Sequence, residues 1–365
     1  MKRITRLLLV VFISLVQAMS VAAQEDMKLL VGADFDTYFD NREYAGSDIG
    51  ISQTIFSSRL TPTIGVEWNR HNRLMLGVDM WSNHGDDTKF ISKARPQLYY
   101  QFDNNKVTAA AGIFSREKLM GDYTELIFSD SVRFFENRVN GFMGQYRGRR
   151  GFVELSLDWY GMYSEASREK FRILSAGRYY FDNYHRRFYG GYAMQMGHYA
   201  GSENIQGCVV DNIIVMPHVG ARFTAFFDFD VSLHYIQTMQ RDRANEESFS
   251  MPGGGMLRAR MEKWGVFLEE QLYVGDNLQP YYSTFRSDSF PYGYGGDLYA
   301  GERFFGTDDG VYSNTKVGYN RKFFDSTLHV NAFIAMQYDG QVWGTKQMVQ
   351  LSVRLNKNID LQQKR

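Results

Sequence analysis

Apolar and polar residues alternate through the stretch from Phe56 to Asn83, with the two-residue period of a β-strand. The alternation is interrupted at residues 69–72, where turn-forming residues gather, and then resumes in a second long segment. The pattern therefore predicts two long antiparallel strands joined by a tight turn. Long strands joined by alternately short and long connections are typical of a transmembrane β-barrel.

The same alternation continues along the chain and predicts an all-β protein, a transmembrane antiparallel up-and-down barrel of about sixteen strands. Short turns alternate with long loops, and both chain ends fall on the side of the short turns, which face the periplasm in such barrels. The predicted strands cover residues 28–39, 56–68, 74–83, 89–102, 106–116, 138–146, 152–163, 169–181, 187–198, 213–226, 229–240, 255–262, 265–274, 311–320, 327–338 and 345–355.

The N-terminal residues predict export. Lys2, Arg3 and Arg6 precede an apolar run that is too short for a membrane helix, and small residues before position 24 form a cleavage site after Ala23. We therefore expect a signal peptide at 1–23 and a single barrel domain at 24–365, ending in a short polar periplasmic tail at 356–365. A mean hydropathy of -0.39 also argues against a helical membrane protein.

Composition narrows the function further. The formal net charge is +0, which gives no electrostatic footprint for nucleic acid. Cys208 is the only cysteine, so no internal disulfide can form. No metal-binding spacing or phosphate loop is present, and we expect no cofactor and no metal site. The histidines at 198, 218, 234 and 329 are scattered without a Ser or Asp at a spacing that forces a catalytic site, so the sequence predicts that the protein is not an enzyme.

With its strand pattern, signal peptide and alternating loops, the chain resembles a Gram-negative outer-membrane β-barrel, and its layout is similar to that of the sixteen-stranded porins. The resemblance covers the mature chain but carries no specific family signature. It implies insertion in the outer membrane and transport of small solutes. The polar tail after Leu355 departs from barrels that end on an aromatic residue.

The residues on the inward parity predict a charged lumen. Positively and negatively charged side chains both lie on this face. Because burying unpaired charges in a dry core costs free energy, these charges imply water in the lumen, pairing across neighbouring strands, or an inserted loop. The inward charges are Arg59, Arg73, Lys93, Arg95, Arg116, Arg172, Arg178, Arg222, Arg258, Arg260, Arg354, Asp34, Asp36, Glu67, Asp79, Glu154, Asp158, Glu262 and Glu269.

The loop at 117–137 is the first candidate functional segment. It follows the fifth predicted strand, the position from which porins fold a loop inward, and it mixes acidic with apolar residues. An exterior loop that packs on its neighbours is the open alternative. If the loop folds inward, the pore constriction consists of Glu117, Asp122, Glu125 and Asp130 opposite Arg59, Arg95 and Arg116.

The longest loop, 276–310, is rich in aromatic residues. Such a surface contacts a sugar, a protein subunit or the mouth of its own barrel. The candidate contact residues are Tyr281, Tyr282, Phe290, Tyr292 and Tyr294.

Two functions remain from the sequence. A porin-like channel that passes small solutes through the charged lumen is the first hypothesis, and a non-conducting subunit or scaffold of an outer-membrane complex is the alternative. An outer-membrane barrel enzyme is the least favoured. The expected partners are outer-membrane lipid and either a small-molecule solute or an envelope protein, without nucleic acid; a homo-oligomer is left open.

Overall fold

The computed structural model describes residues 27–86, 89–182, 186–204, 209–283 and 293–360. The predicted signal peptide, Cys208, Phe290 and Tyr292 lie outside the described residues.

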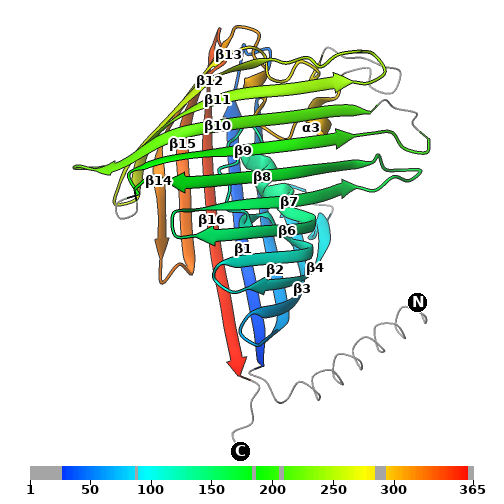
Figure 1. Ribbon diagram of the computed structural model, residues 1–365, viewed down its shortest axis with the longest axis vertical. Helices are drawn as coiled ribbons and strands as arrows, with labels where there is room; N and C mark the ends of the chain where they lie inside the picture. The colour runs from blue at the N-terminus through cyan, green and yellow to red at the C-terminus, as the bar shows by residue number, and fades with distance from the viewer. Residues whose placement is uncertain (1–26, 87–88, 183–185, 205–208, 284–292, 361–365) are drawn as a thin grey trace, which may run out of the picture.

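Sixteen antiparallel strands form one closed barrel, in which each strand pairs with its neighbours in the chain and β1 pairs with β16 (Figure 1). The predicted fold class is confirmed. The strands are β1 (Lys28–Glu43), β2 (Gln53–Trp68), β3 (Asn72–Asn83), β4 (Lys93–Asp103), β5 (Val107–Ser115), β6 (Arg138–Gly148), β7 (Gly151–Gly161), β8 (Lys170–Tyr180), β9 (Phe188–Tyr199), β10 (Val210–Thr224), β11 (Asp228–Asp242), β12 (Gly253–Lys263), β13 (Val266–Gly275), β14 (Val311–Phe323), β15 (Leu328–Tyr338) and β16 (Trp343–Asp360).

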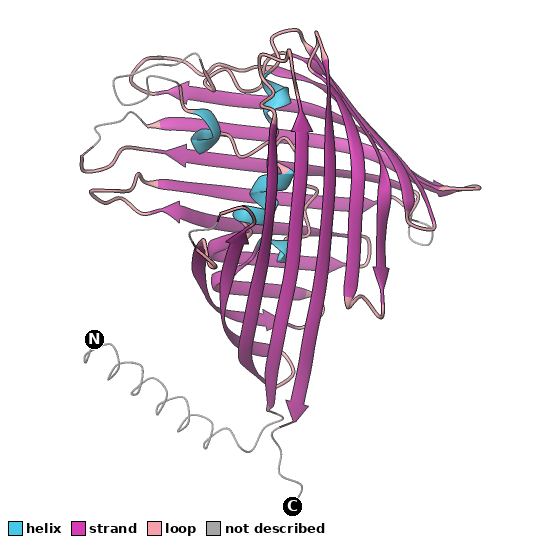
Figure 2. Ribbon diagram, turned by 180° about the vertical axis from the view of Figure 1, so that it is seen from behind, coloured by secondary structure: helices cyan, strands magenta, loops and turns pink. Residues whose placement is uncertain are grey.

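Among the described residues, the few helices all belong to the long loops. They are η1 (Arg116–Lys118), α2 (Asp130–Phe135), α3 (Gly295–Leu298) and η2 (Arg303–Gly306). Figure 2 shows helical turns within the outline of the barrel, behind the strands of its wall. In the described part of the chain, every helix is too short or too polar to cross a membrane.

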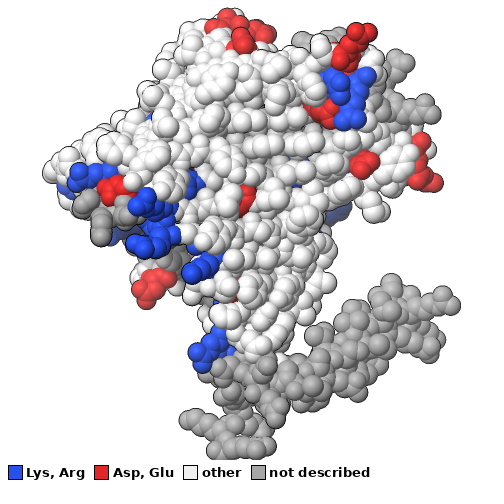
Figure 3. All heavy atoms as spheres, viewed as in Figure 1, with Lys and Arg blue, Asp and Glu red and all other residues white. Residues whose placement is uncertain are grey.

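Alternation gives the wall two different faces. Large apolar side chains are exposed on the outside, including Val31, Phe35, Leu60, Ile64, Leu76, Leu98, Leu155, Val219, Leu233, Val317, Ile334 and Leu355. On the face shown in Figure 3, charged side chains gather toward the strand ends and leave most of the wall between them uncharged. An apolar outer belt on a closed barrel fits lipid, because every backbone hydrogen bond in the hydrocarbon must be made within the wall.

The tight turn predicted at 69–72 closes the β2–β3 hairpin. Asn69 and Arg70, the central residues of a β-turn that the His71 amide closes on the Trp68 carbonyl, have φ values of 52° and 59°, in the left-handed region. Trp68 therefore faces Asn72, and the same register places Ser58 opposite Ser82 near the other end of the hairpin.

The C-terminal prediction needs a correction. Residues 356–360, expected to be a free polar tail, continue β16, and they pair with β1 from Gly32 opposite Asn356 to Lys28 opposite Asp360. The prediction was wrong because β1 extends equally far and offers a complete ladder of backbone partners. Strand ends differ elsewhere too, since β2 begins at Gln53 and β4 at Lys93.

Charges on the inner face pair across neighbouring strands. Asp36 on β1 accepts hydrogen bonds from Arg59 on β2 at 2.6 Å and from Arg354 on β16 at 2.8 Å. Asp158 on β7 lies 3.0 Å from Arg116 and 3.8 Å from Arg172. The lumen wall is therefore a network of opposite charges, with few isolated ones.

The two faces predict opposite responses to a new charge. Leu76→Arg places a cation on the lipid-facing side of β3 and should lower the free energy of unfolding by about 2–4 kcal/mol, if the residue lies near the bilayer midplane. Thr63→Arg is the control, because Thr63 lines a polar cavity in the lumen and should accept the charge. Urea unfolding in lipid vesicles and gel mobility without boiling measure both effects, and equal stability of the two variants would contradict the assignment of the faces.

Candidate functional site

The loop between β5 and β6 folds into the barrel. Asp122 accepts hydrogen bonds from Arg258 on β12 at 3.0 Å and from Arg178 on β8 at 3.3 Å. Lys316 on β14 donates to Glu125, and Lys346 on β16 donates to Asp130 at 2.8 Å. Because these strands lie around much of the barrel, the loop is tied to widely separated parts of the wall.

The electrostatic setting of Asp122 favours its charged form. Burial alone raises the pKa of this carboxyl, but Arg258 and Arg178 outweigh burial and lower the pKa to about 2. The carboxylate therefore stays ionised at neutral pH and holds two arginines of the wall.

The described part of the loop between β13 and β14 completes a plug across the lumen. The Ser129 amide donates to the Ala300 carbonyl at 2.9 Å, and the Glu302 amide donates to the Glu125 carbonyl at 2.6 Å. Apolar side chains of both loops form one buried cluster with residues of the wall: Leu126, Ile127, Phe128, Leu278, Phe304 and Phe305 from the loops, and Leu174, Ile214, Met216, Ile236, Met256, Tyr273 and Tyr312 from the strands. This cluster packs the two loops against the wall of the lumen.

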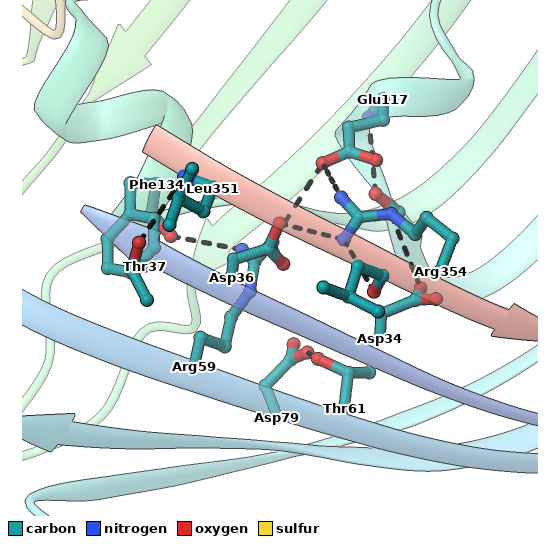
Figure 4. A network of polar contacts seen from close by, with 12 residues as sticks. Asp34, Asp36, Thr37, Arg59, Thr61, Asp79, Glu117, Phe134, Leu351 and Arg354 are labelled. Carbon is teal, nitrogen blue, oxygen red and sulfur yellow. Dashed lines mark hydrogen bonds and ion pairs between the residues drawn. The ribbon is translucent and has the colours of Figure 1, made fainter. Parts of the chain in front are cut away.

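The remaining candidate constriction residues are dispersed around this plug. Glu117 lies 3.4 Å from Arg354 and 3.8 Å from Arg59, at the foot of the loop, where Figure 4 shows it facing the β1–β16 seam. Arg116 contacts Asp158 on β7, and the Arg95 guanidinium lies 5.9 Å from the centre of the Trp81 ring. The four acidic residues of the loop therefore each contact a different part of the wall, and they do not face the three arginines across an open ring.

The aromatic loop residues pack on the barrel itself. Tyr281 and Tyr294 are buried in a cluster with Tyr199 and Tyr299, and Tyr282 packs against this cluster. Tyr294 donates a hydrogen bond to Asp242 at 2.8 Å. The sequence left three interpretations of this loop: contact with a sugar, with a protein subunit, or with the mouth of its own barrel. Tyr281, Tyr282 and Tyr294, the candidate residues that the structure describes, follow the third interpretation.

Three cavities of the lumen lie toward the short turns. One cavity of about 490 Å³ includes Asp34, Arg59 and Arg354 in its lining. Another, of about 600 Å³, includes Arg222, Asp230 and Glu262, and adjoins a third of about 350 Å³ that reaches Asp122 and Ser232. These cavities are polar and end at the plug.

A serine–histidine pair lies inside the lumen on β11. Ser232 Oγ and His234 Nε2 are 2.9 Å apart, and the His234 ring lies 4.8 Å from that of His218 on β10. All three side chains are buried, and Ser232 opens only on the cavity that arginines enclose. The pair can exchange a proton, but an apolar lipid chain has no apolar path to it among the described residues.

A second serine–histidine pair lies on the outer wall. Ser58 Oγ on β2 and His84 Nε2, just after β3, are 2.8 Å apart. The His84 amide donates to the Phe56 carbonyl at 2.9 Å, and the ring lies 4.1 Å from the Phe56 ring. Both contacts fix the imidazole against the hairpin, at the end of the barrel that carries the long loops.

The surroundings of Ser58 suit an ester at the edge of the membrane. Ser58 faces Thr37 on β1 and Ser82 on β3, so three hydroxyl side chains form a row across the lipid-facing wall. One pair further along, toward the long loops, Phe39 and Phe56 lie edge to face at 5.9 Å. Aromatic side chains mark the interface where headgroups meet acyl chains, which is where ester bonds of lipids lie.

Sequence reasoning missed this pair. His84 is absent from the histidines considered, and its partner Ser58 lies 26 residues away in the chain, so spacing along the sequence gives no sign of the contact. The available signal was the turn at 69–72: once Trp68 faces Asn72, Ser58 must face Ser82, and His84 continues past it.

In the described residues, no group of three or more His, Cys, Asp or Glu side chains has the arrangement of a metal site.

Comparison with protein families identifies the barrel. The model of the family described as lipid A 3′-O-deacylase-type matches residues 21–356. The chain belongs to this deacylase-type family. No curated protein sequence matches the chain.

Membership of a deacylase-type family corrects the expectation that the protein is not an enzyme. That expectation rested on histidine spacing along the chain, whereas a barrel brings residues of separate strands together. The deacylase-type barrel has two such serine–histidine contacts among its described residues.

Solved structures agree with the fold of this deacylase-type barrel. OpdL of Pseudomonas aeruginosa matches with a TM-score of 0.52 and 10% identity, over 91% of this chain and 99% of that one. A triple mutant of the Rhodopseudomonas blastica porin matches with a TM-score of 0.43 and 14% identity, over 91% and 100% of the two chains. At such identity the OpdL match supports the barrel fold alone.

The anchoring role of Asp122 predicts a pH-dependent loss of stability. Asp122→Asn removes charge-assisted hydrogen bonds to Arg178 and Arg258 and should lower the free energy of unfolding by about 1.5 kcal/mol. Because the folded pKa is lowered from 3.8 to about 2, this contribution is complete above pH 4 and disappears as the pH falls toward 2. Asp48→Asn, in an exposed loop, is the control; an equal effect of both variants in urea unfolding at neutral pH would contradict the anchoring role.

Proposed function

We propose that this protein is an outer-membrane acyl-ester hydrolase that removes an ester-linked fatty acid from lipid A or a closely related acylated lipid. The contact that carries the proposal is the 2.8 Å approach of Ser58 to His84 on the lipid-facing wall. Family membership supports deacylation, and the position at the long-loop end supports a substrate in the outer leaflet.

The chemistry follows from a serine activated by a histidine. His84 Nε2 accepts the hydroxyl proton while Ser58 Oγ attacks the ester carbonyl carbon, and the resulting tetrahedral intermediate collapses to an acyl-serine. The alcohol of the lipid leaves with the proton from His84. Water then attacks the acyl-serine carbonyl carbon while His84 takes a proton from it, and His84 returns this proton to Ser58 Oγ as the fatty acid is released.

Neighbouring hydroxyl groups extend the site. Thr37 and Ser82 flank Ser58 on the two adjacent strands, and their hydroxyl groups are suited to donate hydrogen bonds to the developing oxyanion. The apolar wall toward the middle of the barrel, where Leu60 follows Ser58 on the same face, provides a surface for the acyl chain.

Substitution of the pair tests the proposal. Ser58→Ala and His84→Ala should each lower the deacylation rate by about 10²–10⁴-fold, since each removes the nucleophile or its base. The measurement is release of fatty acid from lipid A in mixed micelles, followed by mass spectrometry of the lipid product.

The interior pair provides the matched control. Ser232→Ala and His234→Ala remove the same chemical groups from the lumen and should leave the rate unchanged. Loss of activity only in these two variants would place the chemistry inside the barrel and refute the outer site. Full activity of Ser58→Ala would also refute it.

A solute channel is the second candidate, favoured by the polar cavities in the short-turn half of the lumen. The packed loops argue against a continuous path in the resting protein. We therefore expect no stepwise conductance from the wild type in planar bilayers, and conductance after deletion of residues 121–135. Conductance by the wild type would favour the channel, whereas an intact protein without conductance or hydrolysis would favour the subunit or scaffold role.

A further inference from the structure

A hollow of about 610 Å³ lies on the outer wall near the short turns of β6 to β9. Its volume falls in the range of small-molecule binding pockets. The outward-facing residues that line it are Tyr146, Val153, Gly177, Tyr179, Gly190 and Tyr192.

One missing side chain leaves room in the hollow. Gly177 faces Tyr192 and Gly190 faces Tyr179 across the β8–β9 pair. The Tyr192 ring lies over Gly177, 2.9 Å from where a Cβ atom would be, so the roomier glycine position is that of Gly190. A Cβ atom on Gly190 would lie 3.1 Å from the Phe181 ring, an exposed side chain that can move aside. The position therefore tolerates a side chain sterically, and a larger residue there would fill the hollow.

Arginines form one end of the hollow. Arg149 and Arg150, in the β6–β7 turn, belong to its lining and are exposed. Arg150 Nη1 donates to the hydroxyl group of Tyr179 at 2.8 Å, which holds the guanidinium over the tyrosine wall. None of the described lining residues is acidic.

We propose that this hollow binds an anionic glycerophospholipid of the periplasmic leaflet. Short turns face the periplasm in such barrels, so the arginines lie at the headgroup level and the tyrosines at the interface. Guanidinium groups bind phosphate oxygens through paired hydrogen bonds, while the apolar side of the hollow beside Gly190 accepts an acyl chain. The groove is far from Ser58, on other strands and at the opposite end of the barrel, so this inference does not depend on the proposed hydrolase.

Native mass spectrometry of the full-length protein tests the headgroup contact. Phosphatidylglycerol and phosphatidylcholine with identical acyl chains are added to the detergent-solubilised protein, and the fraction that carries one lipid is measured. We expect the wild type to prefer phosphatidylglycerol, and R149Q/R150Q to weaken its binding by about fivefold per arginine with little change for phosphatidylcholine. Arg321 and Lys322, two exposed cations at the short-turn end of β14, give the control R321Q/K322Q, which should keep the preference.

The acyl-chain contact has its own variant. Gly190→Val fills the groove and should weaken binding of both lipids, while gel mobility without boiling confirms that the barrel is intact. Equal loss in R149Q/R150Q and R321Q/K322Q would mean that only total charge matters and would overturn the site. Displacement of the lipid by inorganic phosphate, but not by chloride at the same ionic strength, would reveal a free-anion site and would overturn the lipid assignment.

Discussion

Pairing of the first strand with the last is the constraint on which the rest of this structure depends. β1 and β16 match residue for residue from Lys28 opposite Asp360 to Glu43 opposite Thr345, so the sheet has no free edge. In hydrocarbon an unpaired strand edge would leave several backbone groups without partners, each costing several kcal/mol. Closure also fixes which parity of every strand faces lipid. Once the barrel is closed, an outward residue such as Leu76 must face the lipid, and an inward residue such as Asp79 must face the lumen.

Closure of so many strands leaves a lumen wide enough to hold more than side chains, and this barrel fills it with its own loops. Asp122, Glu125 and Asp130 each meet a cation from a different part of the wall, which fixes the loop along its length. The apolar side chains between these anchors then bury against Leu174, Met216 and other wall residues. The inward charges thus have two roles: pairs such as Asp36 with Arg59 join neighbouring strands, and Arg258 and Lys346 hold the plug.

The sequence was sufficient to predict the strands and the closed barrel, but it was insufficient to predict how the loops fold inside the barrel. Alternation and turn residues predict strand number, order and facing, because each depends on local period and on the rule that neighbours in the chain pair. The position of loop 117–137 could not be decided, since its ion pairs join residues far apart in sequence, as with Glu125 and Lys316. The end of β16 was missed because polar residues such as Asn356 pair through their backbone, which hydrophobic alternation does not detect. Ser58 and His84 were missed for a related reason: their contact depends on hairpin register.

The two serine–histidine pairs illustrate how one wall separates two chemical environments. Ser232 and His234 are on the same strand and the same inward face, enclosed with arginines in a polar cavity. Ser58 is on the outward face, in a row with Thr37 and Ser82 where the neighbouring positions Phe35, Leu60 and Met80 are apolar. A hydroxyl group in such surroundings costs free energy unless it is hydrogen-bonded, and three at one level are not explained by packing. Access decides between the pairs: a lipid ester moving in the plane of the membrane meets the outer hydroxyl row directly, whereas the inner pair is reached only through the polar, short-turn end of the lumen.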